Sequence, residues 1–337
     1  MRHFIVLIIW LLPLIAMAQE WEDRQVFEGT SARQTLRIIS STDTSFFLQV
    51  IESFLAETPE AAVEYLVTGT ADLDKTFRKN PDQFDLVISS AMDLQFKLAN
   101  DGYAARIEGM SHPKWAQWRQ SLFAFTTEPA AIVINRAAFA GQPIPQTRQE
   151  LIQALRADPD RFSGKVGTYD VRQSGLGYLF ATQDARTSET YWRLMEVMGG
   201  LGMRLYCCSG DMIDDLVNGT ITVAYNVLGS YASARSDTAG VVEIILPSDF
   251  PTTMMRTALV SKDASNPKIA IAFIRYLIDL QSSTRNHDRF PLPPLDAVQS
   301  AAGQSAIGLG PALMTYLDKL KRRTFIREWE SAVIQRQ

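Results

Sequence analysis

The sequence predicts an α/β protein made of two doubly wound lobes. Strand, polar turn and amphipathic helix alternate three times between residues 35 and 100. The same alternation resumes after residue 147, and two apolar runs near residue 125 separate the two sets. Repeated strand–turn–helix units are typical of parallel sheets that carry helices on both faces. Two such sets with a break between them indicate two lobes rather than one continuous sheet.

The first set of elements begins with a β-branched strand at 35–39. A helix follows, in which apolar residues recur at helical spacing from Phe46 to Leu55. Thr58-Pro59 ends this helix, because proline does not fit a helix interior. The set continues with a strand at 62–67, a helix at 72–79, a strand at 85–89 and one more helix.

The second set follows two apolar runs at 122–125 and 130–134. Its helices and strands show the same patterns of apolar spacing and turn residues. The predicted elements are a helix at 147–156, a strand at 165–168 followed by a turn and a helix, helices at 190–198 and 212–217, a strand at 221–225, an apolar run at 241–246, a helix at 267–281 and a helical tail after Ala312.

Two crossing strands, near residues 126 and 246, join the predicted lobes. Residues 19–126 and 246–337 then form the first lobe, and residues 127–245 form the second. Doubly wound sheets collect ligands outside the carboxyl ends of their strands. A cleft between two lobes joined in this way can close around a ligand by hinge bending.

Residues 1–18 have the form of a secretory signal peptide. Met1-Arg2-His3 is a basic start, residues 4–18 are apolar, and Ala16-Met17-Ala18 matches the small-x-small pattern of a cleavage site. A membrane anchor is the alternative, but this run is shorter than the roughly 20 residues that a spanning helix needs. We therefore expect export to the periplasm.

The composition is that of an ordinary globular protein, with 46% hydrophobic and 21% charged residues. The formal net charge is −4, and it becomes −5 when Arg2 leaves with the signal. A mildly acidic chain without a basic cluster argues against nucleic acid as a partner. The two cysteines, Cys207 and Cys208, are adjacent. They are either two thiols or a strained vicinal disulfide, since neighbouring Cα atoms lie only about 3.8 Å apart.

The usual machinery of a secreted enzyme is missing from the sequence. After signal removal only His112 and His287 remain, and neither lies in a HExxH motif. Ser174 does not stand in a Gly-x-Ser-x-Gly elbow, and Phe180 replaces the third glycine of a dinucleotide fingerprint. We therefore predict a protein that is not an enzyme and that uses no cofactor or resident metal. A hydrolase acting through Ser174 is the alternative.

Candidate ligand-binding residues lie where the predicted strands run into polar turns. Backbone N–H groups at such turns are unpaired and bind anions and polar ligands. Arg172 beside Ser174-Gly175 could clamp a carboxylate or phosphate while the turn binds the remaining oxygens. The alternatives are a surface pair between Arg172 and Asp170 and plain helix capping by the hydroxyls. The predicted binding residues are Ser40, Thr42, Ser89, Ser90, Arg172, Ser174, Gly175, Asn226 and Ser230.

Four segments of the chain carry a resemblance to a known family. They are residues 128–135, 164–170, 174–178 and 224–231, which read EPAAIVIN, GKVGTYD, SGLGY and AYNVLGSY. In order and spacing they resemble the periplasmic solute-binding proteins of the iron(III)-type ABC transporter family. The branch that looks closest contains the phosphoglycerate transport regulatory protein and the sugar-phosphate binders. The resemblance covers nearly the whole chain after residue 18 and implies the type II periplasmic-binding-protein fold.

The resemblance implies capture of a small organic anion, phosphorylated compounds included, and its delivery to an ABC permease. We expect a monomer. Presentation of the ligand to a sensor kinase of a two-component system is an alternative. The family's iron carriers hold their metal partly through two adjacent tyrosines, whereas this chain reads Leu228-Gly-Ser-Tyr231 there. Iron(III) needs anionic oxygen ligands, so iron binding is an alternative and not the expectation.

Overall fold

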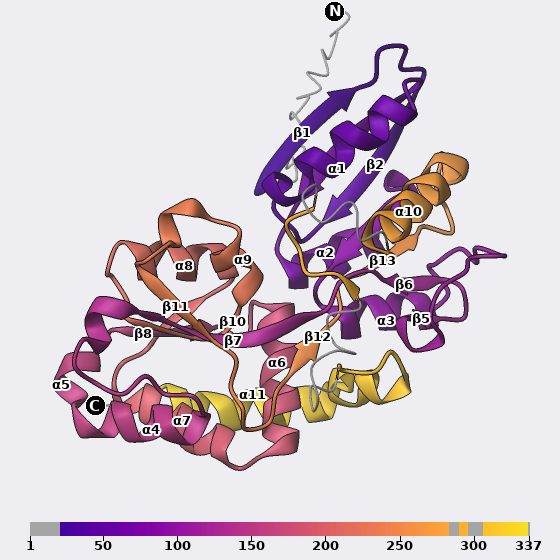
Figure 1. Cartoon of the computed structure of the whole chain (residues 1–337). Coiled ribbons are helices and arrows are strands. Elements are labelled where there is room, and N and C mark those ends of the chain that lie inside the picture. The colour runs from indigo at the N-terminus through magenta and orange to yellow at the C-terminus, as the bar shows by residue number, and fades with distance from the viewer. Residues whose placement is uncertain (1–20, 283–289, 296–305, 336–337) are drawn as a thin grey trace, which may run out of the picture.

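The computed structural model describes residues 21–282, 290–295 and 306–335, so the predicted signal peptide lies outside the described residues. The chain folds into two lobes, each built on its own sheet (Figure 1). The fold class predicted from the sequence, two α/β lobes joined by crossing strands, is confirmed. Among the described residues, no helix is long and apolar enough to cross a membrane.

The first sheet has the strand order β1-β3-β2-β4-β13-β6-β5. Its centre is parallel and its remaining strands pair antiparallel. The strands are β1 (Asp23–Glu28), β2 (Gln34–Ser40), β3 (Ala61–Val67), β4 (Leu86–Ser89), β5 (Gln117–Trp118), β6 (Leu122–Ala124) and β13 (Thr257–Val260). The helices of this lobe are α1 (Thr44–Glu57), α2 (Thr70–Lys79), α3 (Met92–Asn100) and α10 (Pro267–Ser282).

The second sheet has the order β11-β7-β10-β8-β9, with β12 paired to β7. Its strands are β7 (Glu128–Asn135), β8 (Val166–Tyr169), β9 (Arg204–Tyr206), β10 (Val223–Leu228), β11 (Val242–Ile245) and β12 (Thr253–Met254). The helices are α4 (Arg148–Ala157), α5 (Pro159–Phe162), α6 (Gly175–Thr187), α7 (Thr190–Gly200), α8 (Ser209–Val217), α9 (Gly229–Ser233) and α11 (Lys319–Val333).

The chain crosses between the lobes in two neighbouring strands, and α11 lies with the second lobe again after α10. It leaves the first lobe from β6 into β7 and returns from β12 into β13. These two crossings lie side by side, because Met254 of β12 pairs with Glu128 of β7. The hinge between the lobes is therefore a two-stranded connection.

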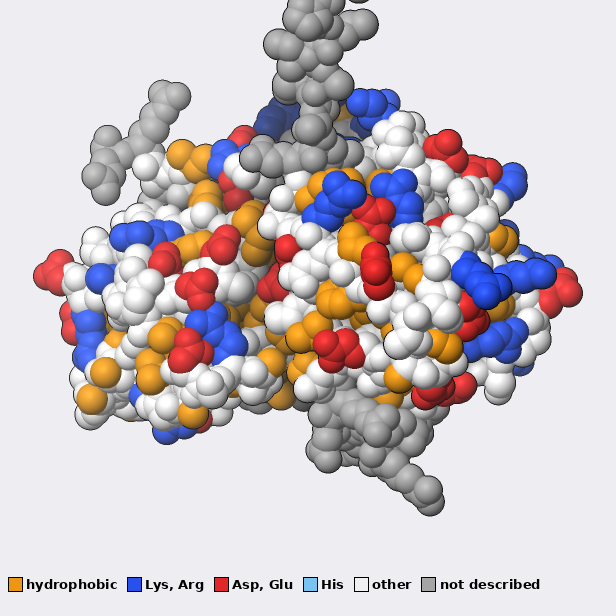
Figure 2. Space-filling model, turned by 90° about the horizontal axis from the view of Figure 1, so that it is seen from above, with side chains coloured by type: hydrophobic (Ala, Val, Ile, Leu, Met, Phe, Trp, Pro, Cys, Tyr) orange, Lys and Arg blue, Asp and Glu red, His pale blue; other side chains and the backbone are white. Residues whose placement is uncertain are grey.

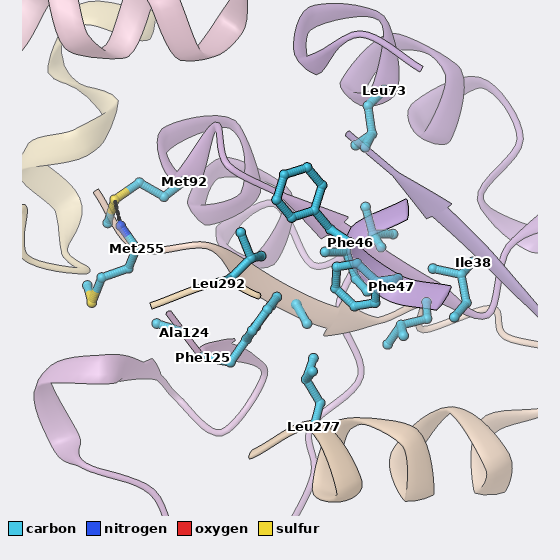
Figure 3. Close-up of a cluster of buried hydrophobic side chains, with 14 of the residues drawn as sticks. Ile38, Phe46, Phe47, Leu73, Met92, Ala124, Phe125, Met255, Leu277 and Leu292 are labelled. Atoms are coloured by element: carbon cyan, nitrogen blue, oxygen red, sulfur yellow. Dashed lines mark hydrogen bonds between the residues drawn. The ribbon is translucent and has the colours of Figure 1, made fainter. Parts of the chain in front are cut away.

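The amphipathic pattern that predicts the helix after residue 44 places its apolar side in the core. Phe46, Phe47, Val50, Ile51 and Phe54 of α1 are all buried. Figure 3 shows Phe46 and Phe47 within a cluster that also contains Ile38 of β2, Phe125 next to β6 and Leu277 of α10. In the same view the backbone N–H of Met255 donates to the sulfur of Met92 at 3.4 Å.

Several strands differ from the sequence predictions. β1, β5, β9 and β12 were not predicted, because β1 exposes most of its residues and the other three have only two or three residues each. β10 ends at Leu228 rather than at Tyr225, so Asn226 lies inside a strand.

The C-terminal helix lies with the second lobe. Phe325 and Trp329 of α11 belong to the same buried cluster as Tyr191 and Met198 of α7, and α11 runs beneath that lobe in Figure 1. The preceding turn at Pro311–Leu317 packs against α3 of the first lobe. The predicted assignment of all of 246–337 to the first lobe therefore does not match the contacts of α11.

Candidate functional site

A pocket of about 530 Å³ lies between the two lobes. One wall comes from α1 of the first lobe and its N-cap, and the opposite wall comes from α8 and α9 of the second lobe. Six of the residues that line it are Asp43, Ser45, Phe46, Gly210, Tyr231 and Arg235. The rings of Phe46 and Tyr231 meet across the lobes with their centroids 4.5 Å apart. The pocket is therefore bounded by both lobes, as a hinge-closing site requires.

Two helices begin at this pocket without a side-chain cap. Asp43 is the N-cap residue of α1 and Cys208 is that of α8, and neither side chain accepts a hydrogen bond from its helix. Ser45 and Gly210, in the first turns of these helices, line the pocket from opposite sides. Unpaired N–H groups and the helix dipole make both walls favourable to negative charge.

The Asp43 carboxylate points into this space from α1. Its Oδ2 lies 3.8 Å from where a Cβ on Gly210 would stand, so it faces the second lobe. Among the described residues it has no hydrogen-bond partner. Burial raises the pKa of Asp43 above its ordinary value of 3.8, Arg256 opposes the rise, and the charges of Asp211 and Asp23 add to it. Asp43 therefore takes up a proton more readily than an exposed aspartate.

Arg235 is a cation on the rim of the pocket. Its guanidinium contacts the Asp214 carboxylate of α8 and donates to Asp237 at 2.7 Å. About one third of the side chain is exposed, so it can exchange these partners for a ligand. Figure 2 shows acidic and basic side chains on both lobes in the view from above.

A buried ion pair occupies the crossing segments below the pocket. Arg256, between β12 and β13, donates through Nε to Oε1 of Glu128 at 2.9 Å and through Nη2 to Oε2 at 3.0 Å. The two side chains are 0% and 1% exposed. Thr126 donates to the same carboxylate at 2.9 Å, and Ser230 does so at 2.6 Å. The guanidinium also contacts Thr42 of the first lobe, so the network ties both lobes to the hinge.

The predicted binding residues of the first lobe lie at the carboxyl ends of its strands, and the hydroxyls of Ser40, Thr42 and Ser89 have partners within the protein. Ser40 accepts from the Tyr65 hydroxyl at 2.7 Å, and Thr42 contacts Arg256. The hydroxyls of Ser41 and Ser89 lie 3.0 Å apart. Ser90 is buried directly after β4. All four predicted residues are buried, and none is among the residues that line the pocket.

Ser174 and Gly175 begin α6, where the first lobe closes against them. The Ser174 hydroxyl caps the helix by accepting from the N–H of Gly177 at 3.1 Å. The Thr70 hydroxyl of α2 accepts from the N–H groups of Gly175 and Leu176 at 2.8 and 3.2 Å. A Cβ on Gly175 would lie 3.0 Å from Leu94 of α3, so glycine allows this close approach of the lobes. In this structure the polar turn binds the other lobe.

Arg172 lies outside the interlobe pocket, and its guanidinium is paired. It donates to Asp170 at 2.7 and 2.8 Å and to Glu330 of α11 at 3.3 Å. It also lies over the ring of Trp329. The pair with Asp170 that the sequence left open as an alternative is the observed arrangement. The contacts of Arg172 with Glu330 and Trp329 hold α11 to the second lobe.

Asn226 and Ser230 also bind within the protein. Asn226 has a φ of 60°, at an irregularity in the pairing of β10 with β7. Asparagine tolerates this left-handed conformation better than most residues. Its amide donates to Asp184 at 2.8 Å, while Ser230 donates to Glu128. Both therefore support the second lobe and the hinge.

Three residues that the structure brings to the boundary between the lobes, Asp43, Thr70 and Arg235, are not among the predicted binding residues. Asp43 and Thr70 each lie three residues after the carboxyl end of a strand, which is a signal for a cleft position. Nothing in the sequence around Arg235 indicates its place, because the pocket forms only when α9 faces α1.

The comparisons with known proteins agree with this architecture. No protein-family model and no curated protein sequence matches the chain. The substrate-binding protein of an ABC transporter from Agrobacterium tumefaciens is 31% identical, over 92% of this chain and 98% of that one, with a TM-score of 0.85.

Two more distant structures share the fold at 14% identity. The periplasmic binding protein AfuA from Actinobacillus pleuropneumoniae, solved with fructose-6-phosphate bound, matches 90% of this chain and 99% of that one, with a TM-score of 0.71. Iron-bound HitA from Pseudomonas aeruginosa matches 89% of this chain and 99% of that one, with a TM-score of 0.65. With the identity to the Agrobacterium protein over nearly the whole of both chains, these findings show that the chain belongs to the substrate-binding proteins of ABC transporters.

Proposed function

We propose that this protein captures a small organic anion in the pocket between α1, α8 and α9 and delivers it to a membrane permease from the periplasm. The observation that carries the proposal is the meeting of two uncapped helix N-termini, those of α1 and α8, on opposite walls of one pocket. Each offers N–H donors and the positive end of a helix dipole. A phosphorylated or carboxylated solute would accept from both lobes at once and so favour closure.

The two charged side chains at the pocket refine the proposal. Arg235 can bind one oxygen of the anion, and its present partners are exposed carboxylates that water can solvate in its place. Asp43 opposes an anion while it is ionised and donates to the anion when it is protonated. Capture should therefore be coupled to protonation of Asp43.

Iron(III) is less well supported as the solute. Tyr231 is the one tyrosine among the described residues that line the pocket. The pKa of Tyr231 lies well above the ordinary value of 10, mainly because the side chain is buried. The phenolate form is therefore disfavoured. Iron(III) requires anionic oxygen ligands, which a protonated tyrosine does not supply.

A ligand panel tests the proposal through thermal unfolding. A solute that binds only the folded protein adds about 2.7 kcal/mol of stability when present at 100 times its Kd. We expect phosphorylated sugars or small carboxylates to raise the melting temperature, and neutral sugars, amines and iron(III) to leave it unchanged. A rise with iron(III) or an amine alone would overturn the proposal of an anionic solute.

Asp43→Asn separates an anionic solute from a cationic or hydroxylated one. The variant resembles the protonated aspartate, so the anion should bind at least as tightly and without the wild-type dependence on pH. In the wild-type protein affinity should rise as pH falls through the raised pKa of Asp43. Isothermal titration at several pH values measures both effects. Without ligand, ionisation of Asp43 lowers stability as pH rises above 3.8, and the variant lacks this loss.

Asp82→Asn is the matched control, because Asp82 is exposed and precedes β4, at the end of the sheet away from the cleft. It should leave affinity and its pH dependence unchanged. Loss of binding in Asp43→Asn would show instead that the ligand donates to Asp43, as an amine or a sugar hydroxyl does.

A further inference from the structure

Two cysteines and a carboxylate gather beside the interlobe pocket, at the carboxyl end of β9. Cys207 and Cys208 follow this strand, and Asp211 lies in the first turn of α8. Both cysteines are free thiols; Cys207 is exposed and Cys208 is half-buried. None of the three belongs to the lining of the solute pocket, although their neighbour Gly210 does. Cys207 is therefore accessible to solvent, and none of the three side chains lines the solute pocket.

The spacing of the three side chains suits a single ion. One donor atom from each of Cys207, Cys208 and Asp211 lies within 4.8 Å of the other two. The Cys207 thiol already donates to Oδ2 of Asp211 at 3.5 Å. Tetrahedral zinc, with zinc–sulfur bonds of about 2.3 Å and zinc–oxygen bonds of about 2.0–2.2 Å, holds neighbouring ligand atoms about 3.6–3.8 Å apart. Side-chain rotations that bring the donor atoms closer by up to about 1 Å would therefore place all three on one metal ion.

The charges around the cluster favour a cation. Glu22 of the first lobe and Asp211 both place negative charge near the two thiols. A divalent cation would relieve this concentration of negative charge. Thiolates select soft metals over magnesium or calcium.

We propose that Cys207, Cys208 and Asp211 bind a thiophilic divalent metal ion of the zinc type at the rim of the cleft. The negative charge of Glu22 on the other lobe acts on this cluster, so a bound cation would attract the first lobe and favour closure of the cleft. The site does not depend on the identity of the solute. Zinc with two thiolates and a carboxylate is within the ordinary range of protein ligands.

Metal titration of untagged, reduced and chelator-treated protein tests this site. Cobalt(II) should produce a thiolate-to-metal charge-transfer absorption, which zinc then abolishes by displacement. Because the chain contains only two cysteines, a chromogenic thiol reagent reports on this site alone. Zinc should protect both thiols from the reagent. Cys207→Ser with Cys208→Ser should lose the absorption while keeping the wild-type melting temperature without metal.

Substitutions of the carboxylates distinguish ligation from simple charge attraction. Asp211→Asn should weaken zinc binding by at least about tenfold, a cost that even outer partners of a metal site can reach. Asp214→Asn on the same helix is the control, because Asp214 pairs with Arg235 and is not part of the cluster. It should change zinc affinity little. Glu22→Gln should weaken binding less than Asp211→Asn does, because Glu22 contributes charge and is not one of the three ligands.

Three outcomes would overturn the proposal. The first is equal zinc affinity in the wild-type protein and the double serine variant, which would place the ion elsewhere. The second is a cobalt complex without thiolate absorption. The third is equal weakening by Asp211→Asn and Asp214→Asn, which would reduce the effect to general charge.

Discussion

Arg256→Ala should lower the free energy of unfolding by about 3–5 kcal/mol, because it leaves the Glu128 carboxylate buried without its cation. Both side chains are almost fully buried, and the pair lies where the two crossing strands meet. Thr42 of the first lobe would also lose its guanidinium partner. Equilibrium unfolding in urea measures the loss.

The pair of Arg24 with Glu64 is the matched control. It has a similar contact distance of 2.7 Å, but the Arg24 side chain is 60% exposed. Arg24→Ala should cost no more than about 1 kcal/mol, since water replaces an exposed partner. The double change of Glu128→Leu and Arg256→Met should recover part of the loss, because it removes both buried charges. Equal losses for Arg24→Ala and Arg256→Ala would contradict the role given to the hinge pair.

Asp184→Ala should cost a similar amount, about 3–5 kcal/mol, because one buried carboxylate serves four donors. Its Oδ1 accepts from Arg148 at 3.1 Å and from Thr252 at 2.7 Å. Its Oδ2 accepts from Tyr225 at 2.7 Å and from Asn226 at 2.8 Å. This carboxylate thus joins α4, α6, β10 and the segment before β12, which returns to the first lobe.

Asp184→Asn should recover only part of the stability, because an amide has one acceptor oxygen where the carboxylate has two. Asp72→Ala is the control, since Asp72 pairs with Lys75 on an exposed helix face. It should cost less than about 0.5 kcal/mol. Urea unfolding of the three variants measures these losses. A loss in free energy of unfolding for Asp184→Ala as small as that for Asp72→Ala would contradict the role given to Asp184.

The regular elements were predictable because their signals are local. The apolar spacing of α1 requires one buried side, and β2, β3 and β4 are short apolar runs bounded by turns. β1 lacks such a signal, since it pairs at the edge of the sheet with most of its residues exposed. β9 is too short to show a period.

The candidate site was predictable in position but not in its contacts. The hydroxyl-rich turns do lie at the carboxyl ends of the strands, where a doubly wound sheet opens. Whether such a turn meets a ligand or another part of the chain depends on what folds against it. Thr70 comes from 105 residues away to meet Gly175, and Glu330 comes from 158 residues away to meet Arg172.

The sequence by itself therefore determined the α/β class, the two-lobed organisation and the position of the cleft at the carboxyl ends of the strands. These features follow from apolar spacing and turn residues, which act over a few positions. Only the tertiary structure decided which polar groups remain open to a ligand. Buried hydroxyls, amides and arginines must find partners when water is removed. Those of the polar turns find them in the opposite lobe, the hinge and the last helix, and Asp43 and Arg235 remain at the pocket between α1 and α9.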